Sequence, residues 1–176
     1  MKKIIKNTFL ISTLCLTIIA CGKKEEVQQE ATQTTEVTQE QNIGMPNPFV
    51  EVKTLDEASK IAGFTLEVPE SYEEYKERVI QAIENDMIEV IYLDEESGFE
   101  GLRIRKAKGT DDISGDYNEY KNIETVKVGD YEVTEKSDGG NIFVATWTDG
   151  TYSYAIDTDR AELSAEAITN LVQNIK

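Results

Sequence analysis

Hydrophobic and polar residues alternate most regularly between residues 143 and 156, on both sides of the dipeptide Asp149-Gly150. Asp-Gly is a favoured two-residue turn between antiparallel strands. With this turn, three apolar pairs face each other across the hairpin: Trp147–Tyr152, Ala145–Tyr154 and Phe143–Ile156. All six side chains then project from one face, which predicts a β-hairpin that covers a core. Gly129-Asp130 predicts a second hairpin, in which Val128 pairs with Tyr131 and Val126 with Val133.

Residues 87–105 predict two more strands. The first has two apolar faces, which is typical of a strand inside a sheet; one carries Ile88, Val90 and Tyr92, and the other carries Met87, Ile91 and Leu93. In the second strand, Leu102 and Ile104 alternate with Arg103 and Arg105, so one face is apolar and the other basic.

Two helices are predicted near the ends of this region. Thr54-Leu55-Asp56-Glu57 has the form of a capping box with Thr54 as the N-cap, and Gly63 suits the position after the last turn. Near the C-terminus, four apolar residues have the i, i+3, i+4, i+7 spacing of a helix face that packs on a core: Ile168, Leu171, Val172 and Ile175.

Two segments between these elements are less regular. Residues 64–68 are expected to form a strand that ends at Pro69. Residues 70–85 suit a helix by composition, but Val79, Ile80 and Ile83 also suit a strand that enters a hairpin at Asn85-Asp86. We favour the strand, from about Arg78, on the basis of the family resemblance given below.

Together these elements predict one α+β domain over residues 47–176, with an antiparallel, curved β-meander sheet and two helices packed on one face. About 130 residues suffice for one ordinary hydrophobic core.

The first twenty residues have a different pattern, in which three lysines precede a short apolar run. The run is shorter than the roughly 20 apolar residues of a membrane-spanning helix, which favours an export signal. Ile18-Ile19-Ala20 followed by Cys21 resembles the lipobox of bacterial lipoproteins. The resemblance implies cleavage before Cys21, a diacylglycerol thioether on its thiol, and often a further acyl chain such as palmitate on the new N-terminus. The alternative is an ordinary or uncleaved signal with an incidental cysteine.

Residues 21–46 would then be the lipidated cysteine and a tether. Gln, Thr and Glu dominate this segment and it has no aromatic residue, so it is expected to be disordered, with an r.m.s. span of roughly 25–30 Å. The chain is therefore expected on the extracytoplasmic face of the cell membrane, attached through lipid on Cys21.

The net charge of the 176-residue chain is −16, and there is no histidine. An acidic chain repels phosphate backbones, so nucleic acid is not expected as a partner. Cleavage before Cys21 would remove Cys15, and lipidation would consume the other thiol. The mature chain would then have no disulfide, no thiol nucleophile and no imidazole, and we expect neither a cofactor nor enzymatic activity.

Residues 47–176 resemble an uncharacterised extracytoplasmic domain family of Gram-positive-type bacteria, found in small lipoproteins and in membrane proteins that resemble anti-sigma factors. The matching residues are 55–72, 87–92, 103–120 and 145–156. The resemblance implies the fold and the location, but no catalytic residues, because none is established for the family.

Two polar groups are candidate sites. Asp112, Ser114, Asp116 and Asn118 alternate as in a calcium loop, although Tyr117 and Ile123 stand where an EF-hand needs Gly and Glu. The alternative is a polar connection whose Tyr117 and Tyr120 tuck under the sheet. Arg103 and Arg105 share a strand face and could bind an anion, or could pair with carboxylates such as Glu89.

Three aromatic residues of the hairpin, Trp147, Tyr152 and Tyr154, could form a ligand platform, but aromatic residues at this spacing more often pack in a core. The sequence therefore favours a non-catalytic binding module of the cell envelope, with another envelope component or protein as its partner. The alternatives are a sensory or regulatory domain of envelope signalling, on fold-level analogy, and a small hydrolase with paired carboxylates.

Overall fold

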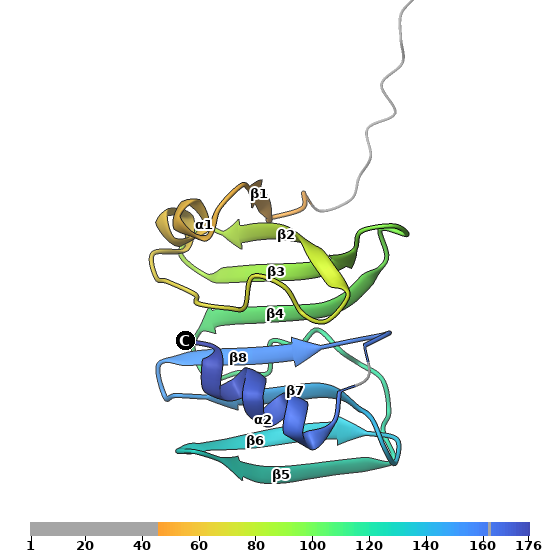
Figure 1. Ribbon diagram of the computed structural model, residues 1–176. Helices are drawn as coiled ribbons and strands as arrows, with labels where there is room; N and C mark the ends of the chain where they lie inside the picture. The colour runs from red at the N-terminus through yellow and green to blue at the C-terminus, as the bar shows by residue number, and fades with distance from the viewer. Residues whose placement is uncertain (1–45, 162) are drawn as a thin grey trace, which may run out of the picture. The chain divides into compact units, whose positions relative to one another are not determined.

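The computed structural model describes residues 46–161 and 163–176, and within these residues eight antiparallel strands form one open, curved sheet (Figure 1). Two helices accompany the sheet in the same described residues, so the predicted α+β fold is confirmed. The bounds are β1 Val50–Val52, α1 Leu55–Ala62, β2 Tyr75–Ile83, β3 Met87–Asp94, β4 Glu100–Lys108, β5 Asn122–Val128, β6 Tyr131–Ser137, β7 Ile142–Thr148, β8 Tyr152–Asp157 and α2 Ala165–Asn174.

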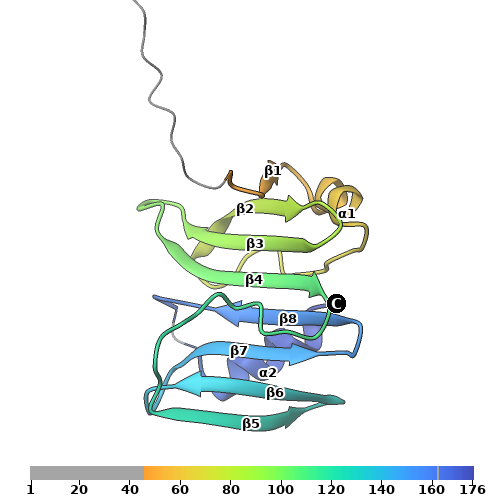
Figure 2. The same cartoon turned by 180° about the vertical axis from the view of Figure 1, so that it is seen from behind.

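The strand order is β1-β2-β3-β4-β8-β7-β6-β5, so the sheet consists of two meanders that meet where β4 pairs with β8. After β4 the chain leaves the middle of the sheet, and β5 begins at the far edge. The connecting loop, residues 109–121, crosses one face of the sheet over β8 and β7 (Figure 2). We call this face the loop face and the opposite one, which α2 covers, the helix face.

The hydrophobic core lies on the helix face. The C-terminal stripe packs there as predicted, because Ile168, Leu171, Val172 and Ile175 are all buried against the sheet. The predicted apolar face of β3 is buried too: Ile88, Val90 and Tyr92 are 0% exposed, and β3 is an interior strand.

Helix α1 begins and ends where the sequence predicts. Thr54 Oγ1 accepts a hydrogen bond from Glu57 N at 3.2 Å, and Glu57 Oε2 accepts one from Lys53 N at 2.9 Å, so the two side chains hold the first turn from both sides. At the other end Gly63 has φ 80°, and its N–H donates to Ser59 O at 2.8 Å.

The hairpin at Gly129-Asp130 has the predicted register. The register predicted for the β7–β8 hairpin is wrong by two residues. Trp147 pairs with Tyr154 and Ala145 with Ile156, because the turn lies one residue later than predicted: Asp149 N donates to Tyr152 O at 3.1 Å, and Asp149 Oδ1 accepts from the N–H groups of Thr151 and Tyr152 at 2.8 Å each. A shift by two residues leaves the side chains on their predicted faces.

Phe143 is the exception in this hairpin. The β6–β7 register shifts after Lys136, and Ile142 joins the core instead of Phe143. The Phe143 ring stacks on Tyr120 of the connecting loop, with centroids 5.8 Å apart. A β-bulge of this kind redirects a side chain, which the alternating pattern alone does not predict.

The prediction of a strand at residues 64–68 is wrong. In this segment Glu67 exchanges two main-chain hydrogen bonds with Lys176, at 2.8 and 3.2 Å. These two bonds do not extend into a β-ladder, and residues 64–68 are not a strand. The open choice for residues 70–85 is resolved in favour of the strand, since β2 spans Tyr75–Ile83 and pairs with β3 across the predicted hairpin.

Candidate functional site

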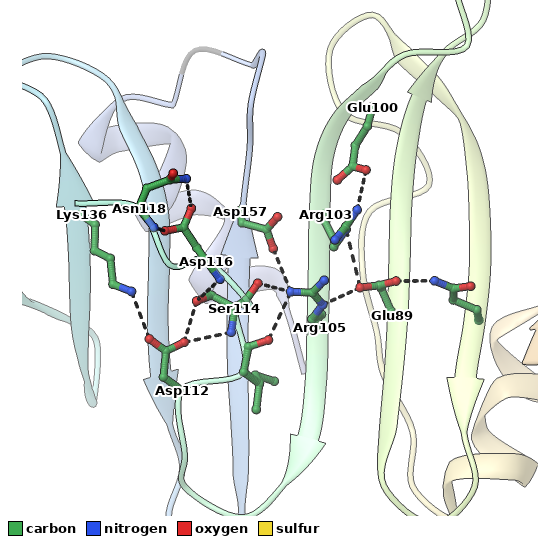
Figure 3. A network of polar contacts seen from close by, with 12 residues as sticks. Glu89, Glu100, Arg103, Arg105, Asp112, Ser114, Asp116, Asn118, Lys136 and Asp157 are labelled. Carbon is green, nitrogen blue, oxygen red and sulfur yellow. Dashed lines mark hydrogen bonds and ion pairs between the residues drawn. The ribbon is translucent and has the colours of Figure 1, made fainter. Parts of the chain in front are cut away.

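The two polar groups singled out by the sequence form a single network on the loop face (Figure 3). Strand alternation positions one half of it: Leu102 and Ile104 enter the core, so Arg103 and Arg105 point to the opposite face. The register then places Glu89 of β3 directly beside Arg105, and Asp157 of β8 beside Arg103.

Glu89 is the most deeply buried member of the network, with 2% of its surface exposed. Its carboxylate accepts hydrogen bonds from Arg105 Nε and Gln81 Nε2, and Arg103 Nε lies 3.5 Å away. Arg103 also binds Glu100 through Nη2 at 2.5 Å. A buried carboxylate needs this kind of compensation, so Glu89 stabilises the sheet only while its partners remain.

Arg105 joins the sheet to the connecting loop. Its Nη1 donates to the main-chain oxygens of Ser114 and, at 3.2 Å, of Ile113, and lies 3.4 Å from Asp157 Oδ1. The loop approaches closely at Gly115, where φ is +67° and a β-carbon would lie 3.2 Å from Nη1. Arg105 therefore fastens the loop to the face that it crosses.

Asp157 is the member that titrates near neutral pH. Burial raises its pKa to about 7, although Arg105 and Arg103 act in the opposite direction. At neutral pH the carboxyl of Asp157 is thus partly protonated, and the charge of the network changes with pH.

The acidic half of the network lies in the loop. Asp112 Oδ1 accepts from the N–H and the hydroxyl of Ser114, and Asp112 Oδ2 pairs with Lys136 Nζ at 3.1 Å. Asp116 accepts from the main chain and side chain of Asn118 and from the Tyr120 hydroxyl at 2.8 Å. These carboxylates stabilise turns of the loop.

The carboxylates of the candidate calcium site, Asp112 and Asp116, are therefore occupied by hydrogen-bond donors of the protein itself. Within residues 46–161 and 163–176, no group of three or more His, Cys, Asp or Glu side chains is placed to hold a metal ion. The alternative, a polar connection whose two tyrosines pack against the sheet, is right for Tyr120, which packs on Phe143. It is wrong for Tyr117, which is 96% exposed. For Arg103 and Arg105 the alternative, pairing with Glu89, is the arrangement observed.

The aromatic residues of the hairpin belong to the core. Trp147 and Tyr154 are each 5% exposed and stack with centroids 5.1 Å apart. Beside them lies Lys106, which is 6% exposed. Its Nζ donates to Thr65 O at 2.8 Å and lies 4.7 Å from the centre of the Tyr152 ring, and burial lowers its pKa. Lys106 thus ties residues 64–68 to the sheet.

Next to the network, the loop face is hollowed by a polar groove that sequence reasoning missed. Two adjoining hollows, of about 320 and 520 Å³, share Glu132, Thr134 and Thr148. We call them the threonine groove; the remaining lining residues are Thr110, Asp111, Asp112, Thr125, Lys127, Asp130, Tyr131, Thr146, Trp147 and Ser153.

A row of three threonines crosses the groove. Thr125 pairs with Thr134, and Thr134 pairs with Thr146, so their side chains stand side by side on three neighbouring strands about 4.8 Å apart. Their hydroxyls have no hydrogen-bond partner among the residues that the structure describes, and neither do the carboxylates of Asp111 and Glu132. The alternation of Thr125 with Val126 and of Thr146 with Trp147 was the available sequence signal.

The predicted signal segment, the lipobox residues Ile18, Ile19 and Ala20, the lipidation site Cys21 and the tether all lie outside the described residues. Within the described part of the chain, neither helix has the length and apolarity to cross a membrane. A search for relatives found no matching protein-family model, no matching curated protein and no matching solved structure.

Proposed function

We propose that this chain is a lipid-anchored, non-catalytic binding protein on the extracytoplasmic face of a bacterial cell membrane, and that the threonine groove holds its partner. The observation that supports binding is the contrast between the two polar regions of the loop face. Arg103, Arg105 and Glu89 are occupied by one another, whereas the hydroxyls of Thr125, Thr134 and Thr146 line an open hollow and have no hydrogen-bond partner among the described residues.

The anchor part of the proposal rests on Ile18-Ile19-Ala20-Cys21. Two or more acyl chains give stable attachment, at about 0.8 kcal/mol for each buried methylene, and an acidic chain gains no help from anionic headgroups. Exported Cys21→Ser protein should leave the membrane fraction, while Cys15→Ser protein should stay in it. Continued partition of Cys21→Ser protein with membranes would contradict the anchor.

The chemistry of the groove indicates what kind of partner fits. Hydroxyl groups donate and accept hydrogen bonds, so the threonine row suits a partner rich in amide or hydroxyl groups. The lining also carries Asp111, Asp112, Asp130 and Glu132 against a single lysine, Lys127. We therefore expect a neutral or basic envelope component, such as an exposed protein segment, rather than an anionic polymer.

Position-specific cross-linking on intact cells tests this assignment. A photoreactive residue at position 134 stands in the groove, and one at position 170 stands on the exposed surface of α2 as the matched control. We expect the same adduct in repeated captures from position 134 and not from position 170. No adduct from position 134, or equal adducts from both positions, would contradict the proposal.

A second function, sensing of envelope conditions, is favoured by one observation: Asp157 has a pKa of about 7 and contacts the arginine that fastens the loop. A shift of external pH across this range would change the contacts of Arg105. Deletion of the chain should then alter transcription of envelope genes after a pH shift, and unchanged transcription would count against sensing.

A further inference from the structure

The two edges of the sheet differ in how well they are protected from another strand. β1 has only three residues and follows Pro48 closely, and short strands and prolines are usual protections. β5 has seven residues, contains no proline, and pairs with β6 without a bulge. Figure 1 shows β5 as the last strand of the sheet, with an open outer side.

The hairpin register shows which main-chain groups point outward from β5. Val128 and Tyr131 close a two-residue turn, so their N–H and C=O groups bond to each other, and the same holds for every second residue along the strand. The alternate residues, Ile123, Thr125 and Lys127, therefore direct their N–H and C=O groups to the outer side. In the described part of the chain no strand pairs with them.

We propose that β5 pairs antiparallel with β5 of a second copy of this chain, about a two-fold axis at Thr125. Thr125 is the middle residue of the strand, so this register pairs all seven residues end to end. The pairs Thr125–Thr125, Ile123–Lys127 and Lys127–Ile123 would exchange six main-chain hydrogen bonds. Two eight-stranded sheets would become one continuous sheet.

The side chains fit this register. Ile123, which is 62% exposed, meets the aliphatic stem of the partner's Lys127, so an exposed apolar side chain becomes covered. Thr125 meets the partner's Thr125, a favourable cross-strand pair. On the helix face Glu124 meets the partner's Val126, so no two like charges stand directly opposite each other in spite of the net charge of −16.

Other two-fold registers fit less well. An axis at Glu124 would place two glutamates directly opposite, and an axis at Lys127 would do the same with two lysines, both of which are destabilising. An axis at Val126 or at Ile123 would leave part of the strand unpaired. The axis at Thr125 therefore combines the longest pairing with the best match of charges.

The dimer would also join the two threonine grooves. The row Thr146–Thr134–Thr125 would continue through the partner's Thr125 into the partner's row, because the outer strand of each row is β5 itself. Six threonines would then lie in line across six strands on one face.

Disulfide cross-linking in the full chain, in membranes of intact cells, tests the two-fold axis. Directly paired residues that exchange hydrogen bonds have Cα atoms about 5.5 Å apart, within the usual range for a disulfide. Thr125→Cys should therefore give a disulfide-linked dimer on mild oxidation. Ile123→Cys is the matched control on the same strand and face, because its symmetry mate would be four residues away along the strand, about 14 Å. The native chain measures any background from its own cysteines.

A variant that leaves the strand intact tests the register. Ile123→Lys would place two lysines opposite each other at both ends of the paired strands, so in the Thr125→Cys background it should slow cross-linking at least tenfold. Val50→Lys on β1 makes the same charge change, from an exposed apolar residue to lysine, at the other edge and should leave the rate unchanged.

The outcomes are distinct. Dimers from Thr125→Cys with few from Ile123→Cys, lost with Ile123→Lys, would support the dimer. Equal dimers from both cysteine positions would indicate random collision and would overturn it. No dimer from Thr125→Cys would also overturn it and would leave β5 to a segment of its own chain or to a different protein.

Discussion

Replacing Arg105 with methionine removes the side chain that fastens the connecting loop to the sheet. The change deletes the ion pairs with Glu89 and Asp157 and the hydrogen bonds to the main chain of Ile113 and Ser114. Removing one partner of a buried ion pair costs about 3–5 kcal/mol, because the other charge stays buried. Glu89 keeps Gln81 and has Arg103 within 3.5 Å, so we expect the lower end, about 3 kcal/mol.

Urea unfolding followed by tryptophan fluorescence measures this loss, since Trp147 is the single tryptophan of the chain and is 5% exposed in the core. Hydrogen exchange measures the loop separately. The amides of Ser114 and Asn118 donate to Asp112 and Asp116 within the loop, and their exchange should accelerate more than global destabilisation explains.

Arg103→Met is the matched control. Arg103 lies two residues away on the same face, pairs with Glu100, and makes no hydrogen bond to the loop. We expect it to cost about 1 kcal/mol, because Glu100 is partly solvated and the buried Glu89 keeps its hydrogen bonds from Arg105 and Gln81, and to leave loop exchange unchanged. An Arg105→Met protein within 1 kcal/mol of the native chain, with unchanged exchange at Ser114, would refute the role assigned to Arg105.

Three further predictions concern stability. Because the pKa of Asp157 is raised to about 7, the folded state holds a proton that the unfolded state has lost between about pH 4 and 7. Native stability should therefore fall relative to Asp157→Asn by up to about 1.4 kcal/mol per pH unit in that window and level off above it; a stability difference that does not vary with pH would be inconsistent with this. A β-carbon at Gly101 would overlap the ring of Tyr75, which is 7% exposed, so Gly101→Ala should lower the free energy of unfolding in urea by about 1–3 kcal/mol. An unchanged denaturation midpoint would show that the ring can move aside. Thr54→Ala removes the N-cap of α1 and should cost about 1 kcal/mol in the same assay, whereas Thr54→Ser should cost little. Equal losses for both variants would speak against capping.

The features predicted correctly from the sequence depend on local patterns. The capping pair Thr54 and Glu57, the turn at Gly129-Asp130 and the apolar stripe of α2 each involve residues close in sequence, and the structure has all three. The pairing of Arg103 and Arg105 with Glu89 could also be anticipated, because neighbouring strands of a meander place such residues side by side.

The features that the sequence did not predict depend on long-range or side-chain effects. The side chain of Asp149 bonds to the turn that follows it, which lies one residue later than predicted, and the bulge beside Phe143 changes a side-chain direction, although the surrounding pattern is regular. The pairing of β4 with β8 joins residues about fifty positions apart. That pairing brings Asp157 to Arg105, and the loop that it requires forms one wall of the threonine groove.

The network and the groove have different roles in this account. The network holds the loop on the sheet and uses its charges internally, whereas the groove, in the proposed function, would offer hydroxyls and carboxylates to a partner. The proposed lipid on Cys21 and the proposed tether would keep this surface near the membrane without fixing its orientation, which would suit a domain that binds other components of the envelope.

The most direct test of the central claim compares two arginine substitutions in the anchored chain on intact cells. Thr146→Arg adds a large cation to the lining of the groove, and Asn170→Arg adds the same group on the exposed surface of α2. Partner capture after cross-linking should fall at least tenfold with Thr146→Arg and stay at the native level with Asn170→Arg. Native-level capture by a folded, membrane-bound Thr146→Arg protein would contradict the claim that the groove is the binding surface.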